Sequence, residues 1–209
     1  MSSPRPHLSR ERIALAAIEL IDRDGLESLS MRRLGAALGV EAMSVYRHFP
    51  SKAALLDLVA ETLLGELELP PPTAEWRGAF RESARAYRAL LLRHPNAIPL
   101  LATLQLTNAG ATRAAGSIMA LLRGIGLDAQ AALSVFSSIV SYVVGFAFWE
   151  TGTAPFRTDP ARGPIALPAD ADPYLVALAP ELAKADCTDS FEMGLDLFIG
   201  GLERHLSAS

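Results

Sequence analysis

The apolar residues of this chain recur three and four positions apart along most of its length. The first segment shows this clearly, because Ala14, Ala17, Ile18 and Ile21 fall on one face of a helix over residues 10–24. There is no sustained alternation of apolar and polar residues, and no Asn-Gly or Asp-Gly turn is flanked by β-branched runs. The pattern therefore predicts an all-α protein.

Glycine, proline and capping residues divide this pattern into helices. The predicted helices cover approximately residues 10–24, 31–38, 41–48, 52–67, 74–94, 109–124, 128–151, 173–185 and 189–206. The prolines from Pro70 to Pro72 cannot continue a helix and mark the main boundary. We expect a DNA-binding domain over residues 1–69, with helix 52–67 as its link, and a helical domain over residues 73–209. Residues 152–172, rich in proline and glycine, are expected to form a long loop.

The segment from Leu29 to Lys52 carries the clearest functional signal. It contains two short predicted helices that meet at a tight turn around Gly39. Apolar residues of both helices can pack inward and set the angle between them, namely Leu34, Leu38, Val40 and Val45. A helix-turn-helix of this kind places its second helix in the major groove of DNA. Together with the preceding helix, the segment predicts a three-helix DNA-binding domain.

The predicted second helix and its flanks hold side chains suited to DNA. Serine can bond base edges, alanine or methionine can touch a thymine methyl group, and tyrosine, histidine and lysine can bond phosphates. The candidate DNA contacts are Arg32, Arg33, Ala42, Met43, Ser44, Tyr46, His48 and Lys52. The alternative for Tyr46, His48 and Lys52 is a packed or solvated position with no contact to DNA.

This part of the chain resembles the tetracycline-repressor (TetR) family. The matching residues are Ala16, Ala17, Gly25, Ser30, Arg32, Arg33, Leu34, Gly39, Val40, Ser44, Val45, Tyr46, His48, Phe49, Ser51, Lys52, Ala54, Leu55 and Leu56. The run Phe191 to Leu197, with Gly201 to Glu203, also resembles the last helix of the tetracycline-repressor subgroup. The resemblance implies a dimeric regulator that binds DNA, with contacts at Arg32, Ala42, Met43, Ser44, Tyr46, His48 and Lys52. Ala42 and Met43 depart from the more polar residues of the subgroup.

The resemblance also bears on the effector. Tetracycline repressors bind a magnesium-chelated drug through a histidine that follows the fifth helix, whereas the matching stretch here, Ala97 to Ala102, has no histidine or carboxylate. We therefore expect no metal and no cofactor, and an apolar or aromatic effector. The residues expected to contact it are Trp76, Phe80, Tyr87, His94, Leu101, Tyr142, Phe146 and Trp149. The alternative is that the aromatic residues are plain core and that His94 serves the end of its helix.

Two further stripes of residues indicate dimerisation. Serines at helical spacing lie in one predicted helix, and aromatic, leucine and glycine residues lie in the last. The expected dimer interface contains Ser134, Ser138, Ser141, Phe191, Gly194, Leu195, Phe198 and Gly201. The alternative for the last helix is a core within the single chain.

Charge and composition refine this picture only modestly. The net charge is −4, but residues 1–52 hold eight Lys or Arg against six Asp or Glu, so the basic charge gathers where DNA is expected. The single cysteine, Cys187, excludes an intrachain disulfide and fits a reducing cytoplasm. Residues 129–149 carry no charge, but four serines and a glutamine favour a buried helix over a membrane span.

The combined expectation is a cytoplasmic homodimer that represses transcription from a palindromic operator and is released by a small effector. The helix over residues 52–67 joins the two domains and is the expected lever between them. An all-helical enzyme is a weaker alternative, because the chain has no HExxH, GxSxG or phosphate-loop motif. A helical protein-interaction module without DNA binding is another, given the apolar pair Ala42 and Met43.

Overall fold

The computed structural model describes residues 8–71, 75–103, 109–152, 170–182 and 187–208, which hold helices, turns and no strand. This confirms the predicted all-α class. The contacts divide the chain into two compact units, residues 1–147 and residues 148–209. The functional boundary predicted between residues 69 and 73 is a different division and stays a prediction.

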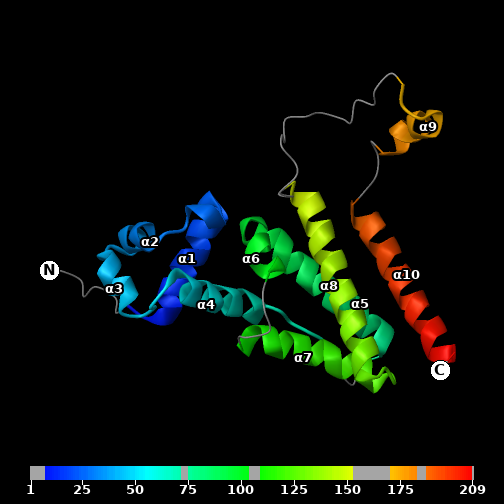
Figure 1. Cartoon of the computed structure of the whole chain (residues 1–209), viewed down its shortest axis with the longest axis horizontal. Helices are drawn as coiled ribbons and strands as arrows, with labels where there is room; N and C mark the ends of the chain where they lie inside the picture. The colour runs from blue at the N-terminus through cyan, green and yellow to red at the C-terminus, as the bar shows by residue number, and fades with distance from the viewer. Residues whose placement is uncertain (1–7, 72–74, 104–108, 153–169, 183–186, 209) are drawn as a thin grey trace. The chain divides into compact units, whose positions relative to one another are not determined.

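The first three helices form a group that we call the head, which is expected to bind DNA (Figure 1). They are α1 (Arg10–Asp24), α2 (Met31–Leu38) and α3 (Ala42–Tyr46), with a 3₁₀ turn, η1 (Leu26–Ser28), after α1. Ser9 and Ser30 cap α1 and α2, since their hydroxyl oxygens accept the N–H groups of Arg12 and Arg33. These two helices have the predicted bounds, whereas α3 is shorter at both ends.

Helix α4 (Lys52–Gly65) leads from the head into the rest of the first unit. Ser51 caps it, and it ends two residues before the predicted position. Its buried residues are Leu55, Val59, Ala60, Leu63 and Leu64, so the helix is apolar on more than one side. It packs on α1 and also on α7 (Ala109–Gly124), which makes it a shared element of head and core.

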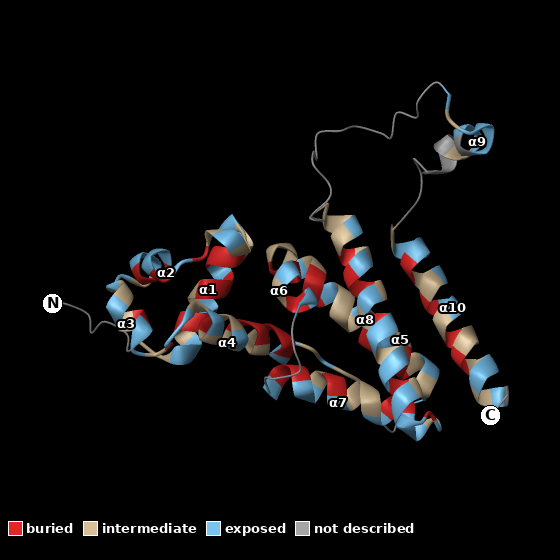
Figure 2. Ribbon diagram, viewed as in Figure 1, coloured by how far each residue is buried: buried red, intermediate tan, exposed pale blue. Residues whose placement is uncertain are grey.

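The remaining helices of the first unit are α5 (Trp76–Arg93), α6 (Ile98–Ala102), α7 and α8 (Ala129–Thr151), with the 3₁₀ turn η2 (Pro95–Ala97) before α6. The expectation that residues 95–102 are not helical is wrong. Pro95 and Pro99 indicate a helix break, but proline is tolerated in the first turn of a helix, where its missing N–H has no partner to lose. Figure 2 shows buried residues on the inward faces of these helices.

Helix α8 is, among the described residues, the helix long and apolar enough to cross a membrane, with a mean hydropathy of 1.9. One face of α8 is buried, with Ala132, Ile139, Val143 and Ala147 on it, and exposed serines lie on the other. A helix with one buried apolar face and one exposed small polar face is typical of a soluble helical domain.

The second unit contains α9 (Pro173–Leu182) and α10 (Cys187–Ala208). Phe191 and Leu195 of α10 are fully buried in the single chain, and their place in a dimer interface stays a prediction. The exposed apolar residues of α10 are instead Met193 and Leu197, at 62% and 68% exposure. Most of the loop predicted over residues 152–172 lies outside the described residues.

Candidate nucleic-acid interface and effector pocket

The turn between α2 and α3 depends on two glycines. Gly39 adopts φ 69° and ψ 31°, a left-handed conformation that side chains disfavour, and its N–H caps the end of α2. Gly35 lets the two helices approach, because a Cβ there would lie 2.9 Å from the carbonyl oxygen of Val40. Leu34 and Val45 are fully buried, as expected from their pattern. The sequence therefore specifies the angle of α3 locally.

Helix α3 presents a face to solvent that suits a DNA groove. Met43 and Tyr46 are 64% and 44% exposed, and Arg47 at the end of the helix is exposed as well. Ala42, Ser44 and His48 are half-buried beside them. Exposed apolar and aromatic side chains are common at surfaces that bind partners, and a side chain such as Met43 suits an apolar group such as a thymine methyl.

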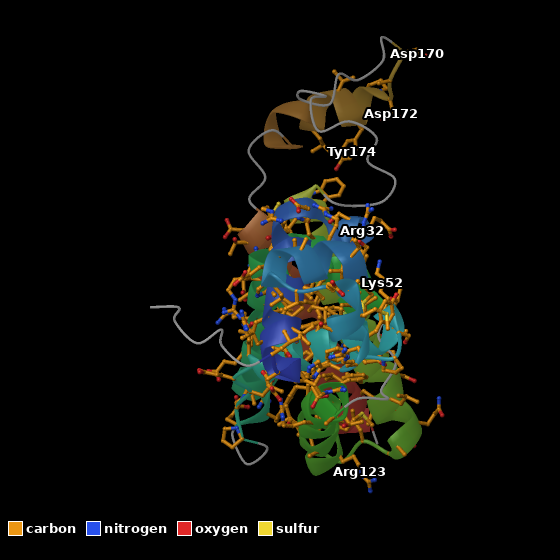
Figure 3. All side chains as sticks on the ribbon, turned by 90° about the vertical axis from the view of Figure 1, so that its left-hand side faces the viewer. Arg32, Lys52, Arg123, Asp170, Asp172 and Tyr174 are labelled. Atoms are coloured by element: carbon orange, nitrogen blue, oxygen red, sulfur yellow. The ribbon has the colours of Figure 1, made fainter. Side chains whose placement is uncertain are left out.

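The basic residues around this face fall into two groups. Arg32, Arg47 and Lys52 form no ion pair with any residue that the structure describes. Arg33, a predicted DNA contact, instead places its guanidinium 2.6 Å from Oδ2 of Asp24 and donates to the carbonyl oxygen of Ser28. Arg33 therefore braces α2 against the end of α1. Figure 3 labels Arg32 and Lys52 on the head.

Two basic residues were missed as parts of this site. Arg47 was not among the predicted contacts, although it is exposed and forms no ion pair with a described residue. Arg10 of α1 donates to the carbonyl oxygen of His48 at 2.6 Å and lies 4.3 Å from the centre of the Phe49 ring. It secures the end of α3, a role that no sequence signal announces because the partners are 38 residues apart.

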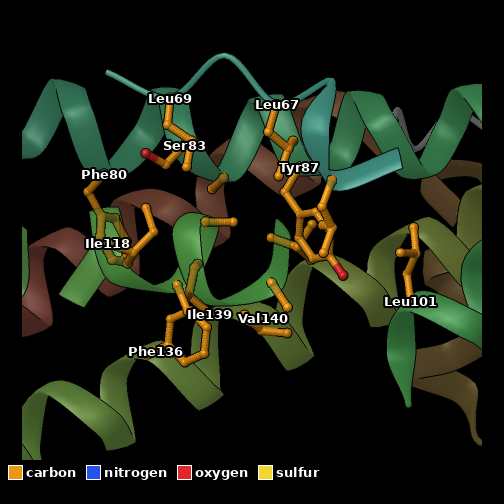
Figure 4. Close-up of a pocket in the computed structure, with 16 residues that line it drawn as sticks. Leu67, Leu69, Phe80, Ser83, Tyr87, Leu101, Ile118, Phe136, Ile139 and Val140 are labelled. Atoms are coloured by element: carbon orange, nitrogen blue, oxygen red, sulfur yellow. The ribbon is translucent and has the colours of Figure 1, made fainter. Parts of the chain in front are cut away.

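An apolar pocket of about 190 Å³ lies among the helices that follow the head (Figure 4). Helices α4, α5, α6, α7 and α8 all contribute to its wall, together with the chain just beyond α4. The lining residues are Leu64, Leu67, Leu69, Phe80, Ser83, Ala84, Tyr87, Leu101, Ala111, Ala114, Ala115, Ile118, Phe136, Ile139, Val140 and Val143. None of them carries a charge, so a charged ligand would lose its hydration without gaining a counter-charge.

Among the described lining residues, Ser83 and Tyr87 carry the polar side chains. The hydroxyl of Ser83 donates to the carbonyl oxygen of Ala79 at 2.7 Å, which leaves its oxygen able to accept. Burial raises the pKa of Tyr87 to about 12, so its phenol is neutral at physiological pH and can donate. The described residues contain no group of three His, Cys, Asp or Glu that could hold a metal ion.

The pocket contains three of the predicted effector contacts, Phe80, Tyr87 and Leu101. The others lie elsewhere. Trp149 is 61% exposed, and Trp76, Tyr142 and Phe146 are half-buried outside the lining. The Tyr142 and Phe146 rings instead contact each other, 5.0 Å between centres.

His94 is also not part of the pocket, because its ring contacts Asp22 of α1 at 2.8 Å. The pocket residues that sequence reasoning missed include Phe136, Ile139, Val140 and Val143 of α8. Their spacing of three, one and three marks one helix face, but the sequence does not say what that face meets.

Comparison with known proteins gives a consistent result over almost the whole chain. Residues 13–59 match the family model of bacterial regulatory proteins of the tetR family. Residues 69–206 match the model of the tetracycline repressor-like C-terminal domain.

Individual relatives agree with these models. The chain is 36% identical over 146 residues to the HTH-type transcriptional repressor DrrR1 of Streptomyces coeruleorubidus, which covers 69% of this chain but only 54% of DrrR1. It is 28% identical to the class G tetracycline repressor protein of Vibrio anguillarum over 94% of both chains. The crystal structure of the Streptomyces coelicolor TetR family protein ActR with actinorhodin matches with a TM-score of 0.81 and 28% identity, over 96% of this chain and 99% of ActR.

Proposed function

Since the chain belongs to the TetR family of transcriptional regulators, which bind DNA and are not enzymes, we propose that it is a homodimeric repressor of a palindromic operator. In this proposal a neutral apolar or aromatic small molecule fills the pocket and releases the operator. The observation that carries it is that α4 connects the two proposed sites. It begins at Lys52, shortly after α3, and Leu64 near its end lines the pocket.

The exposed face of the head supports the DNA-binding part. Arg32, Arg47 and Lys52 bring positive charge to the face that carries Met43 and Tyr46, and the cations have no competing ion pair among the described residues. Phosphate contacts from such cations give affinity, and base-edge contacts from Ser44 and Met43 would give sequence preference. Arg33 is left out of this proposed interface because Asp24 holds it.

The pocket supports the effector class. Its lining is uncharged and its two hydroxyls could orient a ligand with a carbonyl or hydroxyl group. ActR, which has a similar fold, was solved in complex with actinorhodin, and we extend the binding of a small molecule to this chain. A metal-chelated drug fits poorly, since the described lining residues include no carboxylate and no imidazole.

Exposed faces of α8 and α10 support the dimer. Ser134, Ser138 and Ser141 are exposed on α8, and Met193 and Leu197 are exposed on α10. The Ser134 hydroxyl donates to the carbonyl oxygen of Gln130 within its own helix, so burying Ser134 would not leave its proton without a partner. We propose that these faces, with Gly194, Phe198 and Gly201, meet their copies in a symmetric dimer.

The proposed mechanism is a shift between two conformations of a cytoplasmic dimer. One conformation spaces the two heads for successive major grooves, and the other does not. An effector that binds the second conformation more tightly lowers operator affinity by that difference in affinity.

The test starts from a pool of random duplexes. Purified protein should enrich a palindromic sequence, and 2-naphthol, a neutral aromatic probe, should bind the pocket with or without a chelator and weaken the complex. Binding that disappears with chelator would contradict the effector class. Failure to enrich any duplex while the protein stays dimeric would contradict the repressor and favour an interaction module.

A further inference from the structure

A polar cluster joins the head to helices α5 to α8, which we call the pocket half. The proposed DNA and effector contacts do not include any residue of this cluster. It consists of Asp22 near the end of α1, Glu66 just after α4, and Arg93, His94 and Asn96 around the end of α5 and η2. The side chains of these residues link three separate segments of the chain. We call this group the junction cluster.

The central contact is between Asp22 and His94. Nδ1 of His94 lies 2.8 Å from Oδ2 of Asp22, across 72 positions of sequence. A carboxylate only accepts, so Nδ1 carries the hydrogen and donates. The His94 side chain is 14% exposed, and a contact so shielded from water is stronger than a surface pair.

Glu66 approaches the same histidine from the α4 side. Its Oε2 lies 3.6 Å from Nε2 of His94 and 2.8 Å from the guanidinium of Arg93. Glu66 is two residues beyond Leu64 and next to Leu67, both of which line the pocket. A ligand that pushes this wall outward therefore moves the carboxylate that faces His94.

On the head side of the cluster, one acceptor of Asp22 is satisfied and another is not. Asn96 donates to the backbone carbonyl oxygen of Asp22 at 2.9 Å, which satisfies one of the carbonyls left free at the end of α1. Oδ1 of Asp22 is buried and has no hydrogen-bond partner among the described residues. A buried oxygen without a partner is unfavourable. A small rotation of α1 that exposes this oxygen to water would let it accept a hydrogen bond, and that gain would offset part of the cost of the rotation.

We propose that Asp22, His94 and Glu66 form the joint that passes a change at the pocket wall to the orientation of the head. With the pocket empty, the His94 contact to Asp22 holds α1, and with it α2 and α3, in one orientation. Displacement of Glu66 by a ligand shifts His94, releases Asp22 and frees the head. His94 and Asp22 are positioning residues here, and the ligand-driven part of the inference rests on the proposed function.

The first experiment measures head orientation directly and needs neither ligand nor DNA. Spin labels at Ala37→Cys in α2 and Glu82→Cys in α5, both exposed positions, report the distance between head and core in a Cys187→Ser background. Labelled chains are diluted with unlabelled chains so that only pairs within one chain are read. Asp22→Ala and His94→Ala should each broaden the distance distribution about twofold, as two orientations become populated.

Two further variants sharpen this measurement. Asp24→Ala is the matched control, since it removes a carboxylate from the same helix end whose partners, Arg23 and Arg33, both lie in the head. It should leave the distribution narrow. Asp22→Asn keeps an acceptor oxygen and should fall between the wild type and Asp22→Ala. A distribution as narrow as that of the wild type in both Asp22→Ala and His94→Ala overturns the proposal.

The second experiment measures coupling with 2-naphthol as the probe. The measured quantity is the ratio of operator affinity without the probe to operator affinity with it. This ratio should be roughly five or more in the wild type, and within about twofold of one in His94→Ala and in Glu66→Gln. Glu66→Gln lies outside the head and leaves the head folded. If both variants bind the probe and keep the wild-type ratio, the proposal that these residues connect the pocket to the head is wrong. If the wild type itself shows no ratio, the proposed effector class fails, and the spin-label distances still decide the joint.

Discussion

The DNA-binding head and the pocket half of this protein are both helical, yet their sites are built in opposite ways. The head takes its site from 21 consecutive positions, Arg32 to Lys52, with a glycine turn that fixes the geometry locally. The pocket takes its wall from five helices and residues as far apart as Leu64 and Val143. The first site is exposed and mostly polar, whereas the second is an apolar pocket that is partly open.

This difference has a physical origin and a consequence. A groove-reading surface must present side chains at fixed angles, which a capped helix and a tight turn achieve within a short segment. A cavity for an apolar molecule needs walls on all sides, which no single helix can offer. The head should therefore be sensitive to single backbone changes, and the pocket to changes in side-chain volume.

The largest expected effect concerns the proposed dimer surface on α10. Leu197→Asp should produce monomers that no longer bind the operator, because a dimer would bury an unpaired charge at a cost on the order of 3–5 kcal/mol. Sedimentation at micromolar concentration measures this. Leu15→Asp, at a leucine that is 54% exposed on α1, is the control and should remain dimeric. A dimeric Leu197→Asp protein would place the interface on another face.

The second effect tests the local construction of the head. Gly35→Val should destabilise it by roughly 1–3 kcal/mol and abolish operator binding, since the added side chain collides with the backbone at Val40 and Ala42. Thermal unfolding and fluorescence anisotropy with a labelled operator report the two losses. Gly116→Ala, where a Cβ meets nothing within 4 Å, should be neutral or stabilising. Normal operator binding by Gly35→Val would show that the turn tolerates rearrangement.

The third effect compares two aromatic residues, one that lines the pocket and one that does not. Phe136→Ala should weaken binding of 2-naphthol about tenfold or more, because burial of a phenylalanine surface contributes about 1.5–3 kcal/mol. Trp149→Ala should leave the affinity unchanged, since Trp149 is exposed outside the lining. Calorimetric titration measures both. The reverse order of effects would restore Trp149 as an effector contact.

The fourth effect separates the two kinds of cation in the head. Lys52→Ala should weaken binding to operator and random DNA alike and reduce the slope of log affinity against log salt by roughly 0.9 per half-site. Arg33→Ala should leave that slope unchanged, because Asp24 already holds the guanidinium of Arg33 in an ion pair within the head. Anisotropy titrations across a salt series distinguish them. An unchanged slope for Lys52→Ala removes this residue from the proposed interface.

The smallest effect concerns the polar end of the pocket. The pKa of Tyr87 is raised to about 12 in the folded chain from an ordinary value of 10.0. The folded state therefore holds this proton more tightly than the unfolded state. The free energy of unfolding loses a contribution as the pH rises from about 10 to about 12, and none below that range.

Tyr87→Phe should remove that loss while leaving stability near neutral pH little changed. Chemical unfolding at pH 8 and at pH 11 compares the variant with the wild type. Equal losses of stability in both proteins would show that burial does not raise the pKa of the Tyr87 phenol.

Much of the head could be predicted because its determinants are local. The bounds of α1 and α2, the serine caps and the turn at Gly39 all follow from neighbouring residues. The role of Arg33 could not be predicted, since helix spacing shows that it is exposed but not that Asp24, nine positions earlier, reaches it. For the same reason Arg10 was not connected with the end of α3.

The pocket half divides in the same way. Its helices, apart from α6, and the absence of a metal-binding histidine before α7 could be read from the order of residues. The aromatic residues could not be assigned to a pocket, because a helical stripe shows which residues share a face but not which neighbour covers it.

The sequence by itself determined the helical class, the helix-turn-helix and the family resemblance, since these depend on periodicity, caps and turn residues that act over a few positions. Only the tertiary structure decided that Phe136 and Val140 line the pocket while Trp149 does not, and that His94 holds Asp22 of the head. These pairings join residues far apart in the chain. Such contacts arise when packed helices bury their apolar faces together, and this depends on all the helices at once.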